Sequence, residues 1–247
     1  MQRFQPSSFS DEATPNPRAV FAFRRDTMKK RTIFLLVLAA VLACVLFFCR
    51  FYFLGTSSDP VNAKTNADFQ IPDFHSQTDK DEDGLDDQTD LLQGARTYIA
   101  TQPRYKSKYY ETGYPDDGYG VCTDVIANAM LSAGYDLKEL VAEDIAAHPE
   151  EYDIEEPDPN IDFRRVRNLN VYFSHTAIPL TTDISQIDQW QGGDIVIFAN
   201  HIGMVSDQRN DKGIPYVIHH NDPFQSAYEQ DILEKRHDIV GHYRISP

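Results

Sequence analysis

The longest apolar run in the chain extends over residues 33–54 and is interrupted only by Arg50. Roughly 20 apolar residues suffice to cross a bilayer as a helix. Five basic residues lie within positions 24–31, whereas the first basic residue after Arg50 is Lys64. Because basic residues concentrate on the cytoplasmic side of a membrane, we expect a single transmembrane helix over residues 32–54. Residues 1–31 would then be a disordered cytoplasmic tail, and the C-terminal part would be extracytoplasmic.

Apolar residues recur at helical spacing in the region that follows, and the spacing changes near residue 190. Before that point the pattern predicts helices, interrupted by a loop rich in Tyr, Gly and Pro at Tyr105–Tyr119; after it, β-branched and alternating runs predict strands. The expected helices cover Asp87–Gln102, Thr123–Ala133, Leu137–Ala147 and part of Ile161–His175, and the expected strands are Gly193–Phe198, His201–Ser206, Tyr216–His220 and Gly241–Ile245. Helices followed by an antiparallel sheet indicate an α+β domain, which we place at residues 89–247.

The net charge restricts the classes of partner. The region beyond residue 55 holds 35 acidic and 15 basic residues, which gives it a formal charge of −20. Such a field opposes binding to nucleic acid and to anionic surfaces, so no nucleic-acid partner is expected. The same field permits cationic ligands and metal ions, and solubility alone is a sufficient reason for it.

Residues 55–88 have the composition of an acidic juxtamembrane linker, and they end in a string of alternate carboxylates. Calcium prefers several oxygen ligands that converge from a tight turn, and Gly84 would allow that turn. The string resembles bacterial thrombospondin type 3-like repeats and, more loosely, an EF-hand loop, although Leu85 comes one position early and the last acid is an Asp. The alternative is a solvated spacer that caps the next helix. A structural calcium ion would be held by Asp79, Asp81, Asp83, Asp87 and Asp90.

Cys122 is the only cysteine outside the predicted membrane segment, because Cys44 and Cys49 lie within it. A lone thiol accompanied by histidines elsewhere in the chain is a candidate nucleophile. Cys122 stands at the start of a predicted helix, where unpaired N–H groups and the helix dipole favour a thiolate. The same N–H groups would stabilise the oxyanion of an acyl transfer. The alternative is a buried structural thiol.

His201 opens a predicted strand and would act as the general base for Cys122. A third polar group must orient its imidazole, and His219, at the end of the next strand, is the expected one, with His220 and Asn221 as alternatives. A zinc site made by Cys122, His201, His219 and His242 is a further alternative, but no two of these ligands are closely spaced as in zinc motifs.

Several separated motifs resemble the DUF1287 family of uncharacterised bacterial proteins between about Leu91 and Ile245. They are Gly120–Val125, Asn160–Val166, Gly193–Val196, His201–Asp207 and Gly241–Arg244. The order of the cysteine at a helix start, the Gly-Asp-Ile-Val strand, His-Ile-Gly-Met-Val and Val-Ile-His is also similar to the NlpC/P60 papain-like superfamily, whose members are mostly cell-wall peptidases and amidases. That resemblance implies a papain-like fold, with N-terminal helices packed on an antiparallel sheet. It also implies that Cys122 is the nucleophile, His201 the base and His219 the orienting residue, with no cofactor required.

The expected function is therefore a membrane-anchored, extracytoplasmic cysteine hydrolase that cleaves an amide bond, with peptidoglycan stem peptide as its substrate. The paired arginines at 164 and 165 would bind a substrate carboxylate through bidentate contacts, or would neutralise nearby acids. The residues expected at the substrate are Tyr119, Asp124, Arg164, Arg165 and Asn221. The alternative function is a catalytically inactive papain-like module that binds wall peptide or a protein partner.

Overall fold

The computed structural model describes residues 32–46, 63–225 and 227–247. The chain divides into two compact units, Met1–Leu54 and Gly55–Pro247. In the first unit, residues 32–46 form a helix whose side chains are all exposed. Of the helices that the structure describes, none is both long and apolar enough to cross a membrane. Residues 1–31 and 47–54, which belong to the predicted tail and membrane segment, lie outside the described residues.

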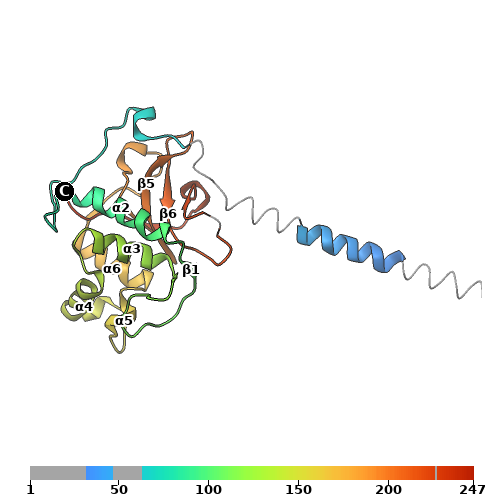
Figure 1. Cartoon of the computed structure of the whole chain (residues 1–247), viewed down its shortest axis with the longest axis horizontal. Coiled ribbons are helices and arrows are strands. Elements are labelled where there is room, and N and C mark those ends of the chain that lie inside the picture. The colour runs from blue at the N-terminus through green and yellow to red at the C-terminus, as the bar shows by residue number, and fades with distance from the viewer. Residues whose placement is uncertain (1–31, 47–62, 226) are drawn as a thin grey trace, which may run out of the picture. The chain divides into compact units, whose positions relative to one another are not determined.

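The second unit is a mixed α+β structure in which helices pack against an antiparallel sheet (Figure 1). Its α-helices are α2 (Asp87–Ala100), α3 (Cys122–Ser132), α4 (Leu137–Ala147), α5 (Pro159–Asp162) and α6 (Val166–Thr176), and its 3-10 turns are η2 (Asn66–Phe69), η3 (Pro149–Glu151), η4 (Ile187–Gln189) and η5 (Leu233–Lys235). The strands of the sheet are β3 (Ile178–Pro179), β4 (Ile195–Phe198), β5 (His201–Arg209), β6 (Pro215–Ile218), β7 (Glu229–Gln230) and β8 (Ile239–Arg244). Their order is β3-β8-β4-β5-β6-β7, and every pair is antiparallel.

The predicted α+β class is confirmed, and most of the predicted elements form close to the expected residues. The stretch Ile161–His175 divides into α5 and α6. The predicted loop Tyr105–Tyr119 carries a short strand at each end, β1 (Arg104–Tyr105) and β2 (Tyr119–Gly120), and the two pair in parallel. This pairing brings the segment that follows α2 beside the start of α3.

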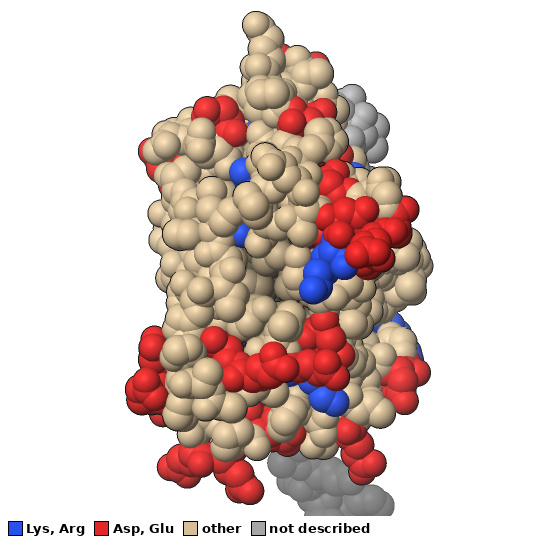
Figure 2. Space-filling view, turned by 90° about the vertical axis from the view of Figure 1, so that its left-hand side faces the viewer, with Lys and Arg blue, Asp and Glu red and all other residues tan. Residues whose placement is uncertain are grey.

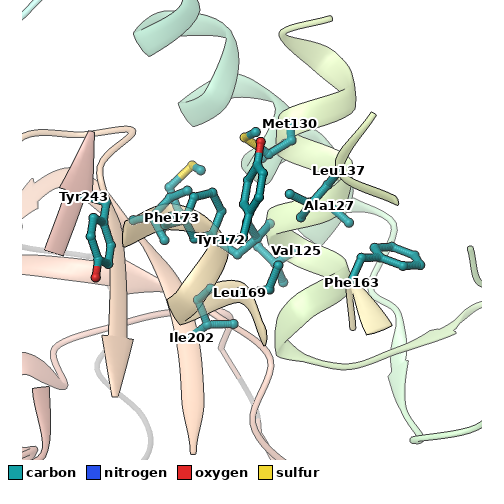
Figure 3. Packing of buried hydrophobic residues seen from close by; sticks show 14 of the residues in the cluster. Val125, Ala127, Met130, Leu137, Phe163, Leu169, Tyr172, Phe173, Ile202 and Tyr243 are labelled. Atoms are coloured by element: carbon teal, nitrogen blue, oxygen red, sulfur yellow. The ribbon is translucent and has the colours of Figure 1, made fainter. Parts of the chain in front are cut away.

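Alternation along the strands gives the sheet two apolar faces, because successive side chains of a strand point to opposite sides. Ile195, Ile197, Ile202 and Met204 belong to the larger core, which they share with α2, α3, α4 and α6. Figure 3 shows side chains of this core, with those of α3 and α6 gathered near Ile202 of β5. The opposite face is covered by a second cluster around Trp190, which includes the alternate strand residues Val196, Phe198, Val205 and Val217.

The described part of the expected spacer packs against the sheet. The backbone N–H of Lys64 donates to the carbonyl of Arg209 at 2.8 Å, which extends the edge of β5. The side chain of Arg209 is fully buried, and it donates to Asn66 Oδ1 at 2.5 Å and to the carbonyls of Gly213 and Trp190 at 2.6 Å. A buried guanidinium with its hydrogen bonds made fixes these segments together. The face of the molecule drawn in Figure 2 displays many Asp and Glu side chains and few Lys and Arg side chains, in keeping with the charge of the sequence.

Candidate functional site

Helix α3 begins at Cys122 because the chain before it is extended and its first turn is capped. Val121 is the N-cap residue, with φ −140° and ψ −178°. Asp124 Oδ2 accepts a hydrogen bond from the Val121 N–H at 2.8 Å, which supplies one half of a capping box. The cap fixes the backbone at Cys122 and places its side chain at the N-terminal end of the helix.

A buried ion pair holds this first turn in place. Arg164 donates from Nε to Asp124 Oδ1 at 2.7 Å and from Nη2 to Asp124 Oδ2 at 2.9 Å. Their side chains are 2% and 0% exposed. Arg164 Nη1 also donates to the carbonyl of Lys108 at 2.8 Å, so one guanidinium connects the helix start to the loop after β1. Both residues, which the sequence analysis assigned to substrate binding, are committed to each other; we therefore treat them as positioning residues.

The thiol of Cys122 lies against the start of β5. Burial is the main influence on it and raises its pKa to about 11, and the charge of Asp124 acts in the same direction. Hydrogen bonds from the backbone N–H groups of Ile202, Thr123 and Cys122 itself lower the pKa, but by less. The expectation of a thiolate favoured by the helix terminus is therefore wrong for the resting protein, because burial disfavours the charged form more than the N–H groups favour it.

His201 and His219 form a hydrogen-bonded pair, as the sequence analysis expected of a base and its orienting residue. Nε2 of His201 lies 3.0 Å from Nδ1 of His219, and the two rings are nearly perpendicular at 84°. Nε2 of His219 lies 3.0 Å from Oε1 of Gln230. Asn221 is exposed and its side-chain amide donates to Asp222 at 3.1 Å, so His219, and not Asn221, contacts His201.

The chain of hydrogen bonds determines which nitrogen of His201 is free. Burial lowers the pKa of His201 to about 2 and that of His219 to about 4, so both rings are neutral near pH 7. Oε1 of Gln230 can only accept, so the proton of His219 is on Nε2 and its Nδ1 accepts from Nε2–H of His201. Nδ1 of neutral His201 is then the unprotonated nitrogen, which is the one available to a proton donor.

Among the described residues, no hydrogen bond links the Cys122 sulfur to His201. What the structure places beside the sulfur is the backbone N–H of Ile202, the residue that follows His201. Catalytic hydrogen bonds are often long in proteins without substrate and shorten when substrate is bound.

A second imidazole, that of His220, packs between two tyrosine rings. Burial raises the pKa of Tyr105, and the charges of Cys122 and Asp222 act in the same direction. His220 meets the Tyr105 ring edge-on with centroids 5.3 Å apart, and it meets Tyr228 at 5.2 Å. Its Nδ1 is buried and has no hydrogen-bond partner among the described residues. His220 thus contacts Tyr105 and Tyr228, whereas the ring of His219 contacts His201.

Two exposed cationic side chains lie over the ring of Tyr119, three residues before Cys122. The guanidinium of Arg104 lies 4.2 Å from the centre of the Tyr119 ring, and the ammonium of Lys106 lies at 5.3 Å. In the described part of the chain neither side chain has a carboxylate partner. Arg165, the remaining predicted substrate residue, is half-exposed and lies 3.7 Å from Asp162. The Tyr119 ring thus has two cationic side chains over it, and the adjacent Lys108 is paired with Asp117.

Sequence reasoning missed Tyr105, Gln230 and the cations Arg104 and Lys106. Tyr105 and the two cations fall in a stretch that had the composition of a loop, and only the β1–β2 pairing, which sets Tyr105 opposite Gly120, brings them beside the helix start. Gln230 approaches His219 through the pairing of β6 with β7. No local sequence signal indicates either contact.

The zinc alternative finds no support in the described residues. His242 is stacked on Trp190 with ring centroids 3.8 Å apart, and its two nitrogens contact Thr181 O at 2.7 Å and Asp194 Oδ2 at 3.2 Å. No cluster of three metal-ligating side chains in the described ranges includes Cys122.

The acidic loop before α2 brings together three of the five predicted calcium ligands. Carboxylate oxygens of Asp79, Asp81 and Asp83 lie within 4.8 Å of one another. Asp87 is turned elsewhere, because its Oδ1 accepts from the Lys80 N–H at 2.9 Å and its Oδ2 accepts from the Tyr135 hydroxyl at 2.6 Å. Asp90 is buried, and its Oδ2 has no hydrogen-bond partner among the described residues.

Comparison with known proteins identifies the family of the chain. Residues 92–245 match the family described as "Domain of unknown function (DUF1287)". The chain belongs to this family. The uncharacterized protein YijF of Escherichia coli (strain K12) is 37% identical to it over 167 residues, which are 62% of this chain and 80% of YijF. No solved structure matches the chain.

The DUF1287 match confirms the family resemblance seen in the motifs. It contains Cys122, His201, His219 and Gln230, and it begins after the acidic loop Asp79–Asp90. The papain-like fold and the roles of the site residues stay predictions, since neither the family description nor the name of YijF states an activity.

Proposed function

We propose that this DUF1287 protein is a cysteine hydrolase that cleaves an amide bond, with Cys122 as the nucleophile, His201 as the base and His219 as the orienting residue. The observation that carries the proposal is the junction of α3 and β5. There the Cys122 sulfur lies among backbone N–H groups of both elements, one of them from Ile202, while the adjacent His201 is hydrogen-bonded to His219 at 3.0 Å. A helix start packed on a sheet in this way is also what a papain-like fold requires.

The resting site holds a neutral thiol and a neutral imidazole. In the proposed reaction Nδ1 of His201 takes the thiol proton as the sulfur attacks the carbonyl carbon and the S–C bond forms. The developing thiolate favours the imidazolium beside it, and the imidazolium favours the thiolate, so each group offsets the effect of burial on the other. N–H groups at the start of α3 stabilise the oxyanion.

Breakdown of the intermediate breaks the C–N bond, and the imidazolium returns its proton to the departing amine. The acyl group is then a thioester on Cys122, and water, deprotonated by His201, hydrolyses it. His219 keeps the His201 ring in one orientation and one tautomer through its hydrogen bond to Gln230. No cofactor enters any step.

We propose peptidoglycan stem peptide as the substrate. The argument rests on the expected topology, in which one membrane anchor leaves the domain outside the cytoplasm. It also rests on the unpaired Arg104 and Lys106 beside Tyr119, since stem peptides carry free carboxylates that cations attract. Peptides with these charges would be attracted by Arg104 and Lys106 against the repulsion of the acidic domain.

Digestion of purified peptidoglycan by the full chain tests this function. Wild type, Cys122→Ala and the matched control Cys44→Ala, which removes a thiol outside the DUF1287 region, are incubated with the polymer and the products are analysed by mass spectrometry. We expect wild type and Cys44→Ala to release peptide fragments with new termini, and Cys122→Ala to release none. Identical fragment profiles from all three proteins would refute wall hydrolysis by Cys122.

A binding module without activity is the second candidate, and one observation favours it: the thiol is protonated at rest and has no hydrogen bond to His201 among the described residues. Such a module would co-sediment with peptidoglycan to the same extent as wild type and as Cys122→Ala. Neither protein would release fragments. If wild type cleaves peptidoglycan, and replacement of Arg104 and Lys106 by Ala abolishes both binding and cleavage, the result favours the hydrolase.

A further inference from the structure

The acidic loop before α2 is curled by its own side chains. Asp79 accepts hydrogen bonds from the backbone N–H groups of Asp83 at 3.2 Å and Gly84 at 2.9 Å. Glu82 and Gly84 have φ values of +59° and +97°, in the left-handed region that tight loops use and that glycine favours. The curl turns the carboxylates of Asp79, Asp81 and Asp83 toward one point, within 4.8 Å of one another.

Asp90 provides independent evidence for a cation at this carboxylate cluster. The residue is 6% exposed, and its Oδ2 is buried with no hydrogen bond to any described residue. After burial, the charges of Asp83, Asp81 and Asp79 are the largest influences that raise the pKa of its carboxyl group, so Asp90 lies within electrostatic reach of the cluster. A buried acceptor without a partner is costly, and the three converging carboxylates of Asp79, Asp81 and Asp83 repel one another unless a cation lies among them.

The loop is docked on the domain rather than free in solvent. Asp87 closes it through the Lys80 N–H and joins it to the Tyr135 hydroxyl. Asp81 contacts the turn between α3 and α4 so closely that a Cβ at Gly134 would lie 3.0 Å from the Cβ of Asp81. Asp86 caps α2 by accepting from the Thr89 N–H at 3.2 Å. An ion bound in the loop would therefore be connected to the start of α2 and to the α3–α4 turn.

We propose that Asp79, Asp81, Asp83 and Asp90 bind one calcium ion that fixes the acidic spacer to the DUF1287 domain. The ligands are carboxylate oxygens, which hard cations such as calcium prefer, and no nitrogen or sulfur ligand that would favour zinc is among them. Calcium accepts the irregular coordination of a flexible loop, whereas magnesium demands near-octahedral geometry. This site does not depend on the proposed hydrolase activity, because it lies outside the catalytic residues.

Two further clusters in the described ranges share His148, one with Asp144 and His175 and one with Glu150 and Glu151, and the first is a weaker metal site than the acidic loop. His175 already uses both nitrogens, Nδ1 toward Asp144 at 2.7 Å and Nε2 toward Glu151 at 3.0 Å. These contacts satisfy the ring without an ion, unlike the unpartnered oxygen of Asp90.

Thermal unfolding of the full chain with defined ions tests the calcium site. Chelator-treated wild type is compared in calcium chloride and in magnesium chloride of equal ionic strength, together with Asp81→Asn and the control Asp116→Asn, which changes an exposed acid outside the loop. Because a ligand that binds only the folded state stabilises it, we expect saturating calcium to raise the Tm of wild type and of Asp116→Asn by about 5 °C. Magnesium should have a smaller effect.

Asp81→Asn should require at least about 10-fold more calcium for the same shift, since it removes one charged ligand. Calorimetric titration of chelator-treated wild type should give one calcium per chain, so the proposal remains testable even if Asp81→Asn folds poorly. Absence of a calcium-dependent shift in wild type, or an equal shift in Asp81→Asn or in magnesium, would overturn the site and indicate general screening of the acidic surface.

Discussion

At the scale of single residues, the side-chain carbonyl of Gln230 decides the proton arrangement of the proposed site. It accepts from Nε2 of His219, and this leaves Nδ1 of His219 to accept from His201. Nδ1 of His201 thereby remains free to take a proton. The proposed base is thus oriented by a residue on β7, and removing Gln230 would leave both rings free to change tautomer and orientation.

Replacement of Gln230 by Ala should lower the rate of peptidoglycan cleavage at least about 10-fold, because part of the general-base contribution is lost. The control is Gln189→Ala, an exposed glutamine in η4, which should leave the rate unchanged. Initial rates of fragment release, compared at equal amounts of folded protein, provide the measurement. Unchanged cleavage by Gln230→Ala would remove Gln230 from the proposed chain of hydrogen bonds.

The sign of the Cys122 pKa shift is a residue-scale property that the sequence predicted wrongly. The sequence shows the helix start, whose N–H groups and dipole favour a thiolate. It does not show the burial that packing against the larger core brings, and burial is the larger influence. Distant segments supply that environment, so no local pattern contains it.

At the scale of elements, the first turn of α3 is held by residues from three segments. Asp124 caps the helix, Arg164 joins it from the link between α5 and α6, and the carbonyl of Lys108 completes the contact from the loop after β1. Gly120, two residues before Cys122, has no space for a side chain, because a Cβ there would lie 2.0 Å from the Tyr98 hydroxyl oxygen. The position of the Cys122 backbone is therefore determined by long-range contacts.

Loss of the Arg164 side chain should lower the free energy of unfolding by about 3–5 kcal/mol, because it leaves the carboxylate of Asp124 buried without its partner. The adjacent Arg165 is the matched control, since its side chain is 50% exposed. Arg165→Ala should change stability by less than about 1 kcal/mol. Urea unfolding of the two variants measures both values, and equal effects would show that the Asp124–Arg164 pair does not have the role assigned to it.

The sequence predicted elements well where the signal is local. Apolar spacing and the stops at Pro103 and Gly134 located α2 and α3 to within two residues at each end. His219 and His220, which follow the end of β6, make separate contacts, His219 with His201 and His220 with Tyr105. The β1–β2 pair and the partner strand β7 of β6 escaped prediction because β1, β2 and β7 have two residues each, too few to show a period.

At the scale of the whole molecule, three buried imidazoles make stability depend on pH. Burial lowers the pKa of His201 to about 2 and the pKa values of His219 and His220 to about 4. In the unfolded chain a histidine takes up a proton near pH 6.5. Between pH 6.5 and 4 the unfolded state therefore binds more protons than the folded state, and stability falls as the pH falls.

The contribution of His220 can be isolated by replacing it with Phe, which keeps an aromatic ring between Tyr105 and Tyr228. The loss of unfolding free energy between pH 7 and pH 4.5 should be smaller in His220→Phe than in wild type by about 2 kcal/mol. Carboxylates that titrate in the same range contribute equally to both proteins and cancel. Urea unfolding at the two pH values gives the comparison, and an unchanged pH dependence would mean that His220 is readily protonated in the folded protein.

The molecule thus combines a DUF1287 domain, whose helix start and sheet form the proposed hydrolase site, with an acidic loop outside the family match that forms the proposed calcium site. The central claim is that Cys122 and His201 act as one catalytic unit. Its most direct test is the rate at which iodoacetamide alkylates Cys122, followed by peptide mass as a function of pH in wild type, His201→Ala, His220→Ala and the exposed control His237→Ala.

We expect His201→Ala to react at least about 10-fold more slowly than wild type between pH 7 and 8, because the neutral thiol needs a base to accept its proton. His220→Ala and His237→Ala should react as wild type does, and in His201→Ala the rate should rise only as the pH approaches the thiol pKa of about 11. A Cys122 that reacts at the same rate and with the same pH profile with and without His201 would contradict the account.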